Sequence, residues 1–192
     1  MTNPLKPLGR WLTTRDVASL TAWLAHSPRR RVIIDAVYTF DTCFHPSTLS
    51  LLATGRAILL HSLTKGWLHP RLFGIALVPE ADTLALAPVF RAQPPPQANL
   101  ARARELMGRH SELPSAVSAE LAAARERLFS ALPAQFSKCA CADAPGYFHA
   151  IEAGWSALLE KANVLGLPAA VFGSPREDIT ILSALSFINL RA

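Results

Sequence analysis

Four side chains within the first 65 residues have the types that imine chemistry requires. Lys65 carries a primary amine, and Ser62 and Thr64 place hydroxyls beside it. Asp35 supplies a carboxylate thirty residues earlier. A lysine amine can form a Schiff base with a carbonyl group, a carboxylate can keep a heterocyclic nitrogen protonated, and hydroxyls can hold a phosphate. Together these types are the ones needed to bind a phosphorylated carbonyl cofactor.

Two short apolar segments must position these groups. Residues 31–37 are rich in Val and Ile without polar alternation, as expected of a strand that is covered on both faces in a parallel sheet. Residues 57–60 repeat the pattern and deliver Lys65 just beyond their end. Ligands of open α/β sheets gather at the carboxyl ends of the strands. We therefore expect Asp35, Tyr38 and Lys65 to meet at that edge.

Three motifs stand in an order typical of one family. Ser62-Leu63-Thr64-Lys65 resembles the S-x-[ST]-K lysine motif of the class I/II aminotransferases, which are fold-type I pyridoxal-phosphate enzymes. Asp35-Ala36-Val37-Tyr38 resembles their D-x-x-Y motif, and Asn3-Pro4 resembles the N-P dipeptide that opens the segment leading to the aspartate strand. Each motif alone is a weak signal. The order and spacing of all three make the resemblance specific.

The resemblance implies a role for each matched residue. Lys65 is the expected catalytic residue, forming a Schiff base with pyridoxal 5'-phosphate and moving a proton during the reaction. Asp35 is expected to bond the pyridine nitrogen, and Tyr38 and Asn3 the phenolic oxygen. The expected cofactor-binding residues are Asn3, Asp35, Tyr38, Ser62, Thr64 and Arg71.

Two positions depart from the family pattern. Where the family has a phosphate-binding arginine eight residues after the lysine, this chain has Phe73, and Arg71 is the nearest replacement. Arginine suits bidentate phosphate binding, although a surface arginine in a loop is the alternative. The late arginine that holds the substrate carboxylate in the family is replaced by Ala184, and Arg191 lies too far on to substitute for it. The resemblance therefore leaves the substrate open.

The chain has 192 residues, enough for one domain or a domain and a half. The family resemblance covers residues 3 to about 188 but matches only the carboxyl-terminal half of the family pattern, whose chains need roughly twice this length. We expect an α/β protein in which residues 1–92 form a partial cofactor-binding large domain with a mostly parallel sheet. Residues 93–192 should supply connecting helices and an α+β small domain, after a hinge at the three prolines 94–96.

Capping signals and periodicity predict the remaining elements. Thr13 and Asp16 favour a helix start, Pro114 suits a first helical turn, and Gly166 is expected to stop a helix. Helices are expected near residues 14–26, 97–109, 114–131 and 154–165, and strands near 72–78, 136–141, 147–152, 169–172 and 179–188.

Composition argues against several other functions. No apolar run reaches the roughly 18 residues that a membrane helix needs, and the start of the chain lacks the pattern of a signal peptide. We expect a cytoplasmic protein without a membrane partner. The net charge of +5 is attributed to arginines on solvated helix faces, so no nucleic-acid partner is expected. The three cysteines and six histidines lack metal-ligand spacing, so no metal is expected.

Three functions remain open. The first is a pyridoxal-phosphate-dependent aminotransferase acting on an amino acid or amine, present as a shortened chain or fragment. The second is a decarboxylase or lyase that uses the same cofactor, and the third is a non-catalytic remnant or interaction protein of the same fold. One predicted helix, at residues 14–26, cannot cover both faces of an apolar sheet, so we expect a homodimer or a complementing chain.

Overall fold

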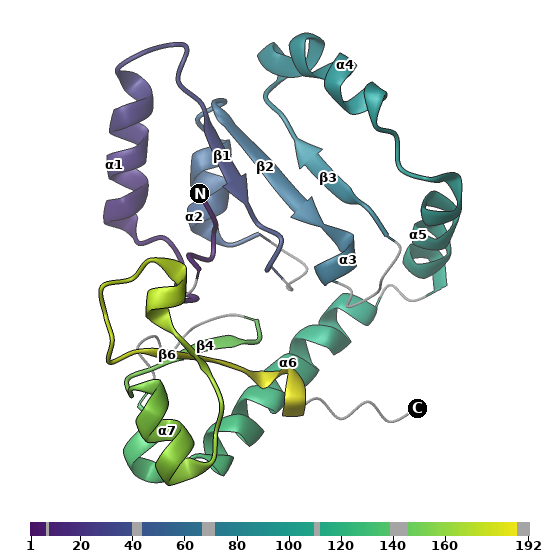
Figure 1. Cartoon of the computed structure of the whole chain (residues 1–192). Coiled ribbons are helices and arrows are strands. Elements are labelled where there is room, and N and C mark those ends of the chain that lie inside the picture. The colour runs from purple at the N-terminus through teal and green to yellow at the C-terminus, as the bar shows by residue number, and fades with distance from the viewer. Residues whose placement is uncertain (7, 40–43, 67–71, 110–111, 139–145, 188–192) are drawn as a thin grey trace. The chain divides into compact units, whose positions relative to one another are not determined.

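The computed structural model describes residues 1–6, 8–39, 44–66, 72–109, 112–138 and 146–187 (Figure 1). The chain divides into two compact units, each with a small three-stranded sheet and helices, in agreement with the expected α/β class. Unit 1 comprises Met1–Asn3 and Trp11–Val117, and unit 2 comprises Pro4–Arg10 and Ser118–Ala192.

The sheet of unit 1 is mixed. Strand β1 (Val32–Asp35) pairs in parallel with β2 (Ala57–Ser62), and β2 pairs antiparallel with β3 (Gly74–Leu77). The expectation of a mostly parallel sheet is therefore wrong for the third strand. The reason lies in the connection between β2 and β3, which contains the four-residue helix α3 (Leu63–Gly66). A parallel crossover usually needs a dozen or more residues and a full helix.

Strands β1 and β2 bury one face of this sheet, whereas β3 has no buried residue. Val32, Ile34 and Leu59 lie on that face with at most 6 % exposure. On the opposite face, Ile33 is 52 % and Leu60 is 37 % exposed. The expectation that β1 is covered on both faces is wrong within the described residues. A run of apolar residues indicates that both faces of a strand should be covered. It does not indicate whether the covering residues come from the same chain.

Two helices adjoin the sheet in unit 1. Helix α1 (Thr14–Ala25) confirms the prediction for residues 14–26, and Thr13 and Asp16 form the reciprocal capping box that the sequence indicates. Helix α2 (Pro46–Leu52) was not predicted; it contacts both α1 and β2. Its seven residues are too few to show a helical period.

Three more helices follow β3. Helix α4 (Thr83–Ala92) was not predicted, and none of its side chains is buried. The three prolines separate it from α5 (Gln97–Arg109), and α6 (Leu113–Ala131) then follows, both close to their predicted bounds. A short 3-10 turn, η1 (Glu80–Asp82), precedes α4.

Unit 2 contains an antiparallel sheet of order β4-β6-β5. Strand β4 (Phe148–Ile151) confirms the strand predicted near 147–152. Strand β6 (Thr180–Ser183) occupies the start of the range predicted at 179–188, and β5 is the two-residue segment Leu167–Pro168. The strand predicted near 169–172 is instead the 3-10 helix η3 (Ala169–Phe172). Because Pro168 lacks an N–H, a longer ladder is unfavourable there.

Two further expectations in unit 2 need correction. Residues 134–136 form the 3-10 helix η2 (Ala134–Phe136) rather than the start of a strand, and positions 139–141 lie outside the described residues. Beyond β6, the chain forms the 3-10 helix η4 (Ala184–Phe187) instead of continuing as a strand.

Helix α7 (Trp155–Ala162) ends earlier than predicted. Its cap is Asn163, which adopts the left-handed conformation with φ 53°. Gly166, the expected stop, has a packing role instead: a Cβ there would lie 2.4 Å from Thr180 Cγ2 and 2.5 Å from Leu182 Cδ2.

The helices of the described segments include none that is both long and apolar enough to cross a membrane.

Candidate functional site

Asp35 is the last residue of strand β1 and belongs to the predicted site. Its side chain is half-buried, and Oδ1 accepts a hydrogen bond from the Val37 N–H at 3.1 Å. The Asp35 backbone pairs with the first residues of the chain, because its N–H donates to the Met1 carbonyl at 2.8 Å and its carbonyl accepts from the Asn3 N–H at 3.0 Å. Asp35 is therefore held by its main chain on the edge of β1 opposite β2.

Lys65 lies on α3, three residues after the end of β2. Since β1 and β2 run in parallel, with Asp35 opposite Leu60, the carboxyl end of each strand reaches the same edge of the sheet (Figure 1). The backbone thus brings the Asp35 and Lys65 segments to one edge, as the sequence predicts. The Lys65 side chain lies outside the described part of the structure, so its catalytic role stays a prediction.

The flanking hydroxyls occupy different elements. Ser62 is the last residue of β2, opposite Gly74, and Thr64 lies within α3; both are half-buried. Their role as phosphate-binding groups stays a prediction. Arg71 lies outside the described residues.

Tyr38 follows Asp35 in a tight turn. The Thr39 N–H donates to the Ala36 carbonyl at 3.0 Å, and Tyr38 between them is half-buried. His61 Nδ1 lies 3.1 Å from the same Ala36 carbonyl, within hydrogen-bonding distance. His61, which the sequence analysis did not select, therefore supports the turn that carries Tyr38. The position of His61 directly before the lysine motif is the sequence feature that could have identified it as a site residue.

Asn3 is fully buried and fully engaged as a donor. Its Nδ2 donates to Ser47 Oγ at 3.0 Å and to Thr48 Oγ1 at 2.8 Å, and its Oδ1 accepts from the Leu12 N–H at 3.1 Å. A side-chain amide has two N–H groups. A bond from Asn3 to a cofactor oxygen therefore requires one of these bonds to open, and the expected role of Asn3 stays a prediction.

Residues at the start of α2 complete this buried network. His45 caps the helix, and its Nδ1 lies 2.7 Å from Ser47 Oγ and accepts from the Ser47 N–H at 3.2 Å. The His45 ring stacks on Trp11 with centroids 4.3 Å apart. The sequence analysis missed these residues. Pro46, which favours the first turn of a helix, was the local signal.

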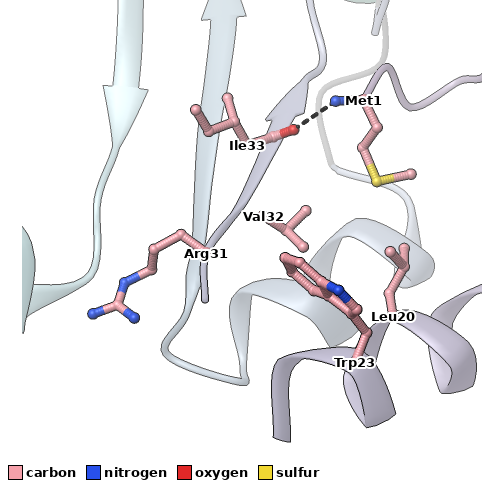
Figure 2. A pocket seen from close by; sticks show the side chains of 6 residues that line it. All are labelled: Met1, Leu20, Trp23, Arg31, Val32 and Ile33. Atoms are coloured by element: carbon pink, nitrogen blue, oxygen red, sulfur yellow. Dashed lines mark hydrogen bonds between the residues drawn. The ribbon is translucent and has the colours of Figure 1, made fainter. Parts of the chain in front are cut away.

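Two cavities in unit 1 have linings that include none of the predicted cofactor residues. The larger, of about 360 Å³, lies between α1 and β1, and Figure 2 shows its lining: Met1, Leu20, Trp23, Arg31, Val32 and Ile33. The smaller, of about 190 Å³, lies where α1 and α2 begin and includes Thr14, His45 and Ser47. Across the described ranges, no three His, Cys, Asp or Glu side chains gather as metal ligands would.

Comparisons with known proteins identify the fold. No family model and no curated protein sequence matches the chain. Among solved structures, YbdL from Escherichia coli, for which a methionine aminotransferase function is identified, matches with a TM-score of 0.75 and 21% identity, over 97% of this chain and 55% of that one. The aromatic aminotransferase from Pyrococcus horikoshii OT3 matches with a TM-score of 0.70 and 19% identity, over 95% and 53% of the two chains.

A third solved structure comes from Corynebacterium diphtheriae and is assigned as a pyridoxal-phosphate-dependent beta-cystathionase. It matches with a TM-score of 0.71 and 17% identity, over 98% of this chain and 56% of that one. The chain thus spans about half the length of the structures it matches. At these identities the likeness is one of fold: the chain has an α/β fold that corresponds to about half of an aminotransferase chain.

Proposed function

We propose that the chain is the lysine-bearing part of a pyridoxal-phosphate-dependent enzyme and that its reaction is transamination of the class I/II type. One observation carries the proposal: Asp35 and the segment of Lys65 reach the same edge of the sheet, because β1 and β2 are parallel. The likeness to about half of several aminotransferase chains supports it. The substrate would be an amino acid or an amine.

The described residues fit the cofactor in part. The half-buried Asp35 carboxylate has one oxygen bonded to Val37 N–H and can still bond a pyridine nitrogen. Asn3 fits less well, because both of its N–H groups are already in use. The chain's half-length match supports a further proposal, that a homodimer or a complementing chain completes the site. Alone, the chain should bind the cofactor weakly.

The proposed roles follow from these positions. Bound pyridoxal phosphate would supply a carbonyl group for an amine and a ring that withdraws electrons. The Lys65 amine would hold the carbonyl carbon and later move a proton at the substrate α-carbon. Asp35 would keep the ring nitrogen protonated, and Tyr38 would bond the phenolic oxygen. Ser62 and Thr64, together with Arg71, would hold the phosphate.

Borohydride reduction tests the proposal. The full chain is incubated with pyridoxal phosphate, reduced, digested and mapped by mass spectrometry. We expect the label on Lys65 and loss of that label in Lys65→Ala. Lys138, whose side chain is 76 % exposed, serves as the internal control for non-specific reaction. Label on Lys138 with none on Lys65 would show that the lysine assignment is wrong.

A second candidate reaction is lyase or decarboxylase chemistry, which uses the same residues. The match to the C. diphtheriae structure favours keeping it. Product analysis separates the reactions, because transamination transfers the amino group to an added 2-oxo acid. A lyase releases a leaving group from the substrate side chain, and a decarboxylase releases carbon dioxide. A non-catalytic remnant, the third possibility, would give no label on Lys65 and no product.

A further inference from the structure

Ala36 joins the turn after β1 to strand β2. Its N–H donates to the Leu60 carbonyl at 2.8 Å, and the residue is fully buried. Its carbonyl accepts from the Thr39 N–H at 3.0 Å and lies 3.1 Å from His61 Nδ1. Both main-chain groups of Ala36 are therefore bonded, and two of the partners, Leu60 and His61, are consecutive residues of β2.

The contact with the Ala36 carbonyl specifies which ring nitrogen of His61 carries a hydrogen. A carbonyl oxygen can only accept a hydrogen bond, so Nδ1 must be the donor. In a neutral imidazole the other nitrogen, Nε2, then holds the lone pair. The tautomer of His61 is therefore a measurable signature of this bond.

The His61 ring also contacts Phe44. The two rings meet edge to face, with centroids 5.8 Å apart and planes at 85°. Such pairs of rings attract one another modestly. Ala36 and Phe44 lie on either side of Tyr38 in the sequence. His61 therefore contacts the segment of Tyr38 on both sides of the tyrosine, through a hydrogen bond before it and a ring contact after it.

These contacts lie where the ladder between β1 and β2 ends. The last pair in its register is Asp35 with Leu60. After that pair, one strand leads into the turn of Tyr38 and the other leads through His61 to Lys65 on α3. The His61 side chain thus extends the connection between the two segments by one residue beyond the ladder. A shift of the turn would move its side chains relative to the lysine segment.

We infer that His61 is a positioning residue of the proposed site. Its Nδ1–H, bonded to the Ala36 carbonyl, sets the position of Tyr38 relative to the lysine segment. This inference rests on the proposed function, and the role does not require His61 to touch the cofactor. Because a misplacement of about 1 Å can reduce a rate by about 100-fold, losing this one bond should affect the reaction more than the binding of the cofactor.

Two substitutions separate the hydrogen bond from the ring contact. His61→Asn keeps a donor, because its amide nitrogen stands close to the place of the imidazole Nδ1, but it loses the ring. His61→Phe keeps a ring beside Phe44 but has no donor. His26→Phe is the matched control, since His26 is exposed at the end of α1 and its Nδ1 also lies near a carbonyl, that of Ala22 at 2.7 Å.

The first measurement uses the full chain without cofactor. At about pH 8, where an ordinary imidazole is neutral, nitrogen NMR should place the hydrogen of the His61 ring on Nδ1. Hydrogen exchange at the Thr39 amide, which shares the Ala36 carbonyl, should quicken about threefold to tenfold in His61→Phe, because the turn loses one bond. It should change little in His61→Asn and in His26→Phe.

The second measurement uses the chain loaded with pyridoxal phosphate in deuterated water. A mixture of the common amino acids is the probe, and mass spectrometry follows deuterium at the α-carbon of each. We expect this exchange to fall about tenfold or more in His61→Phe while borohydride still labels Lys65, and to return close to the parent rate in His61→Asn. A merely structural role would lower labelling and exchange together.

A hydrogen on Nε2 of His61, or unchanged Thr39 exchange in His61→Phe, would overturn the bond. Substrate exchange that is retained in His61→Phe, or lost equally in His61→Asn, would overturn the positioning role. An unlabelled Lys65 in the parent chain would refute the proposed function and the positioning role with it, whatever the tautomer and the Thr39 exchange show. The two kinds of failure are therefore distinguishable.

Discussion

Asn3 and Thr48, forty-five positions apart, are joined by a hydrogen bond of 2.8 Å from Asn3 Nδ2 to Thr48 Oγ1. The same amide donates to Ser47 and accepts from the Leu12 N–H. Asn3, Ser47 and Thr48 are all buried. A single side chain thus links the segment beside β1 to the first turn of α2 and to the residues that lead into α1.

Asn3→Ala should destabilise the chain by about 2–4 kcal/mol, because it leaves the Leu12 N–H and two hydroxyls without their buried partner. A double-mutant cycle with Thr48→Val should give a coupling of about 1 kcal/mol. Urea denaturation measures both. Ser50→Ala, an exposed hydroxyl on the same helix, is the control and should change stability little. Strict additivity of Asn3→Ala and Thr48→Val would contradict the network.

His149 should make unit 2 sensitive to acid. Its side chain is fully buried, and among the described residues neither ring nitrogen has a hydrogen-bond partner. Burial, together with the positive charges of Arg125 and Lys6, lowers the His149 pKa to about 4. Because the folded pKa lies below the unfolded value, the unfolded chain binds the extra proton first. The stabilisation is complete above about pH 6.5 and is lost as the pH falls toward 4.

The loss should amount to about 3 kcal/mol across that window. Urea midpoints at several pH values between 7 and 4 provide the measurement, with His149→Leu as the matched variant. Carboxylates contribute equally to both proteins, so the difference between them isolates the histidine. A variant whose stability falls as steeply as that of the parent would exclude His149 as the source.

Local signals predicted the longer elements well. The capping box formed by Thr13 and Asp16 indicates the start of α1, and periodic apolar residues indicate α5 and α6. These local signals failed at positions where tertiary packing determines the local structure. Asn163 ends α7 in a left-handed conformation, a role that the sequence analysis gave to Gly166.

The candidate site was predictable where it depends on strand ends. Parallel pairing of β1 and β2 follows from two apolar runs, and it places Asp35 near the lysine motif. The partners of Asn3 could not be foreseen, because Ser47 and Thr48 belong to a short helix without a period and lie more than forty positions away. Buried polar contacts across such separations leave no local pattern in a sequence.

Gly166→Ala should destabilise the chain by about 1–3 kcal/mol through overpacking, since the new methyl group would collide with Thr180 and Leu182. Thr180→Ser removes one of the colliding methyl groups and should recover part of the loss. Gly108→Ala is the control: nothing lies within 4 Å of its Cβ position in α5, so a gain of about 0.5–1 kcal/mol is expected. Thermal denaturation is measured for the parent chain, Gly166→Ala, Gly166→Ala with Thr180→Ser, and Gly108→Ala. Equal changes in stability at both glycines would refute close packing at Gly166.

Asp35→Asn tests the carboxylate with little change to the fold. Asparagine keeps the oxygen that accepts from the Val37 N–H at 3.1 Å, but it loses the negative charge. If Asp35 holds a proton on the pyridine nitrogen, the variant should still be labelled at Lys65 by borohydride. Exchange of the substrate α-hydrogen with solvent should fall by about 100-fold or more, because the ring no longer withdraws electrons as strongly.

The control for Asp35→Asn is the same chemical change at Asp178, an exposed carboxylate that pairs with Arg176 in unit 2. Asp178→Asn should leave both labelling and α-hydrogen exchange unchanged. Retained exchange in Asp35→Asn would assign the carboxylate a structural role in the turn before Tyr38. Loss of labelling together with exchange would indicate that Asp35 is needed to bind the cofactor. The expected result, labelling without exchange, is the outcome that a purely structural carboxylate cannot give, because the asparagine preserves the turn.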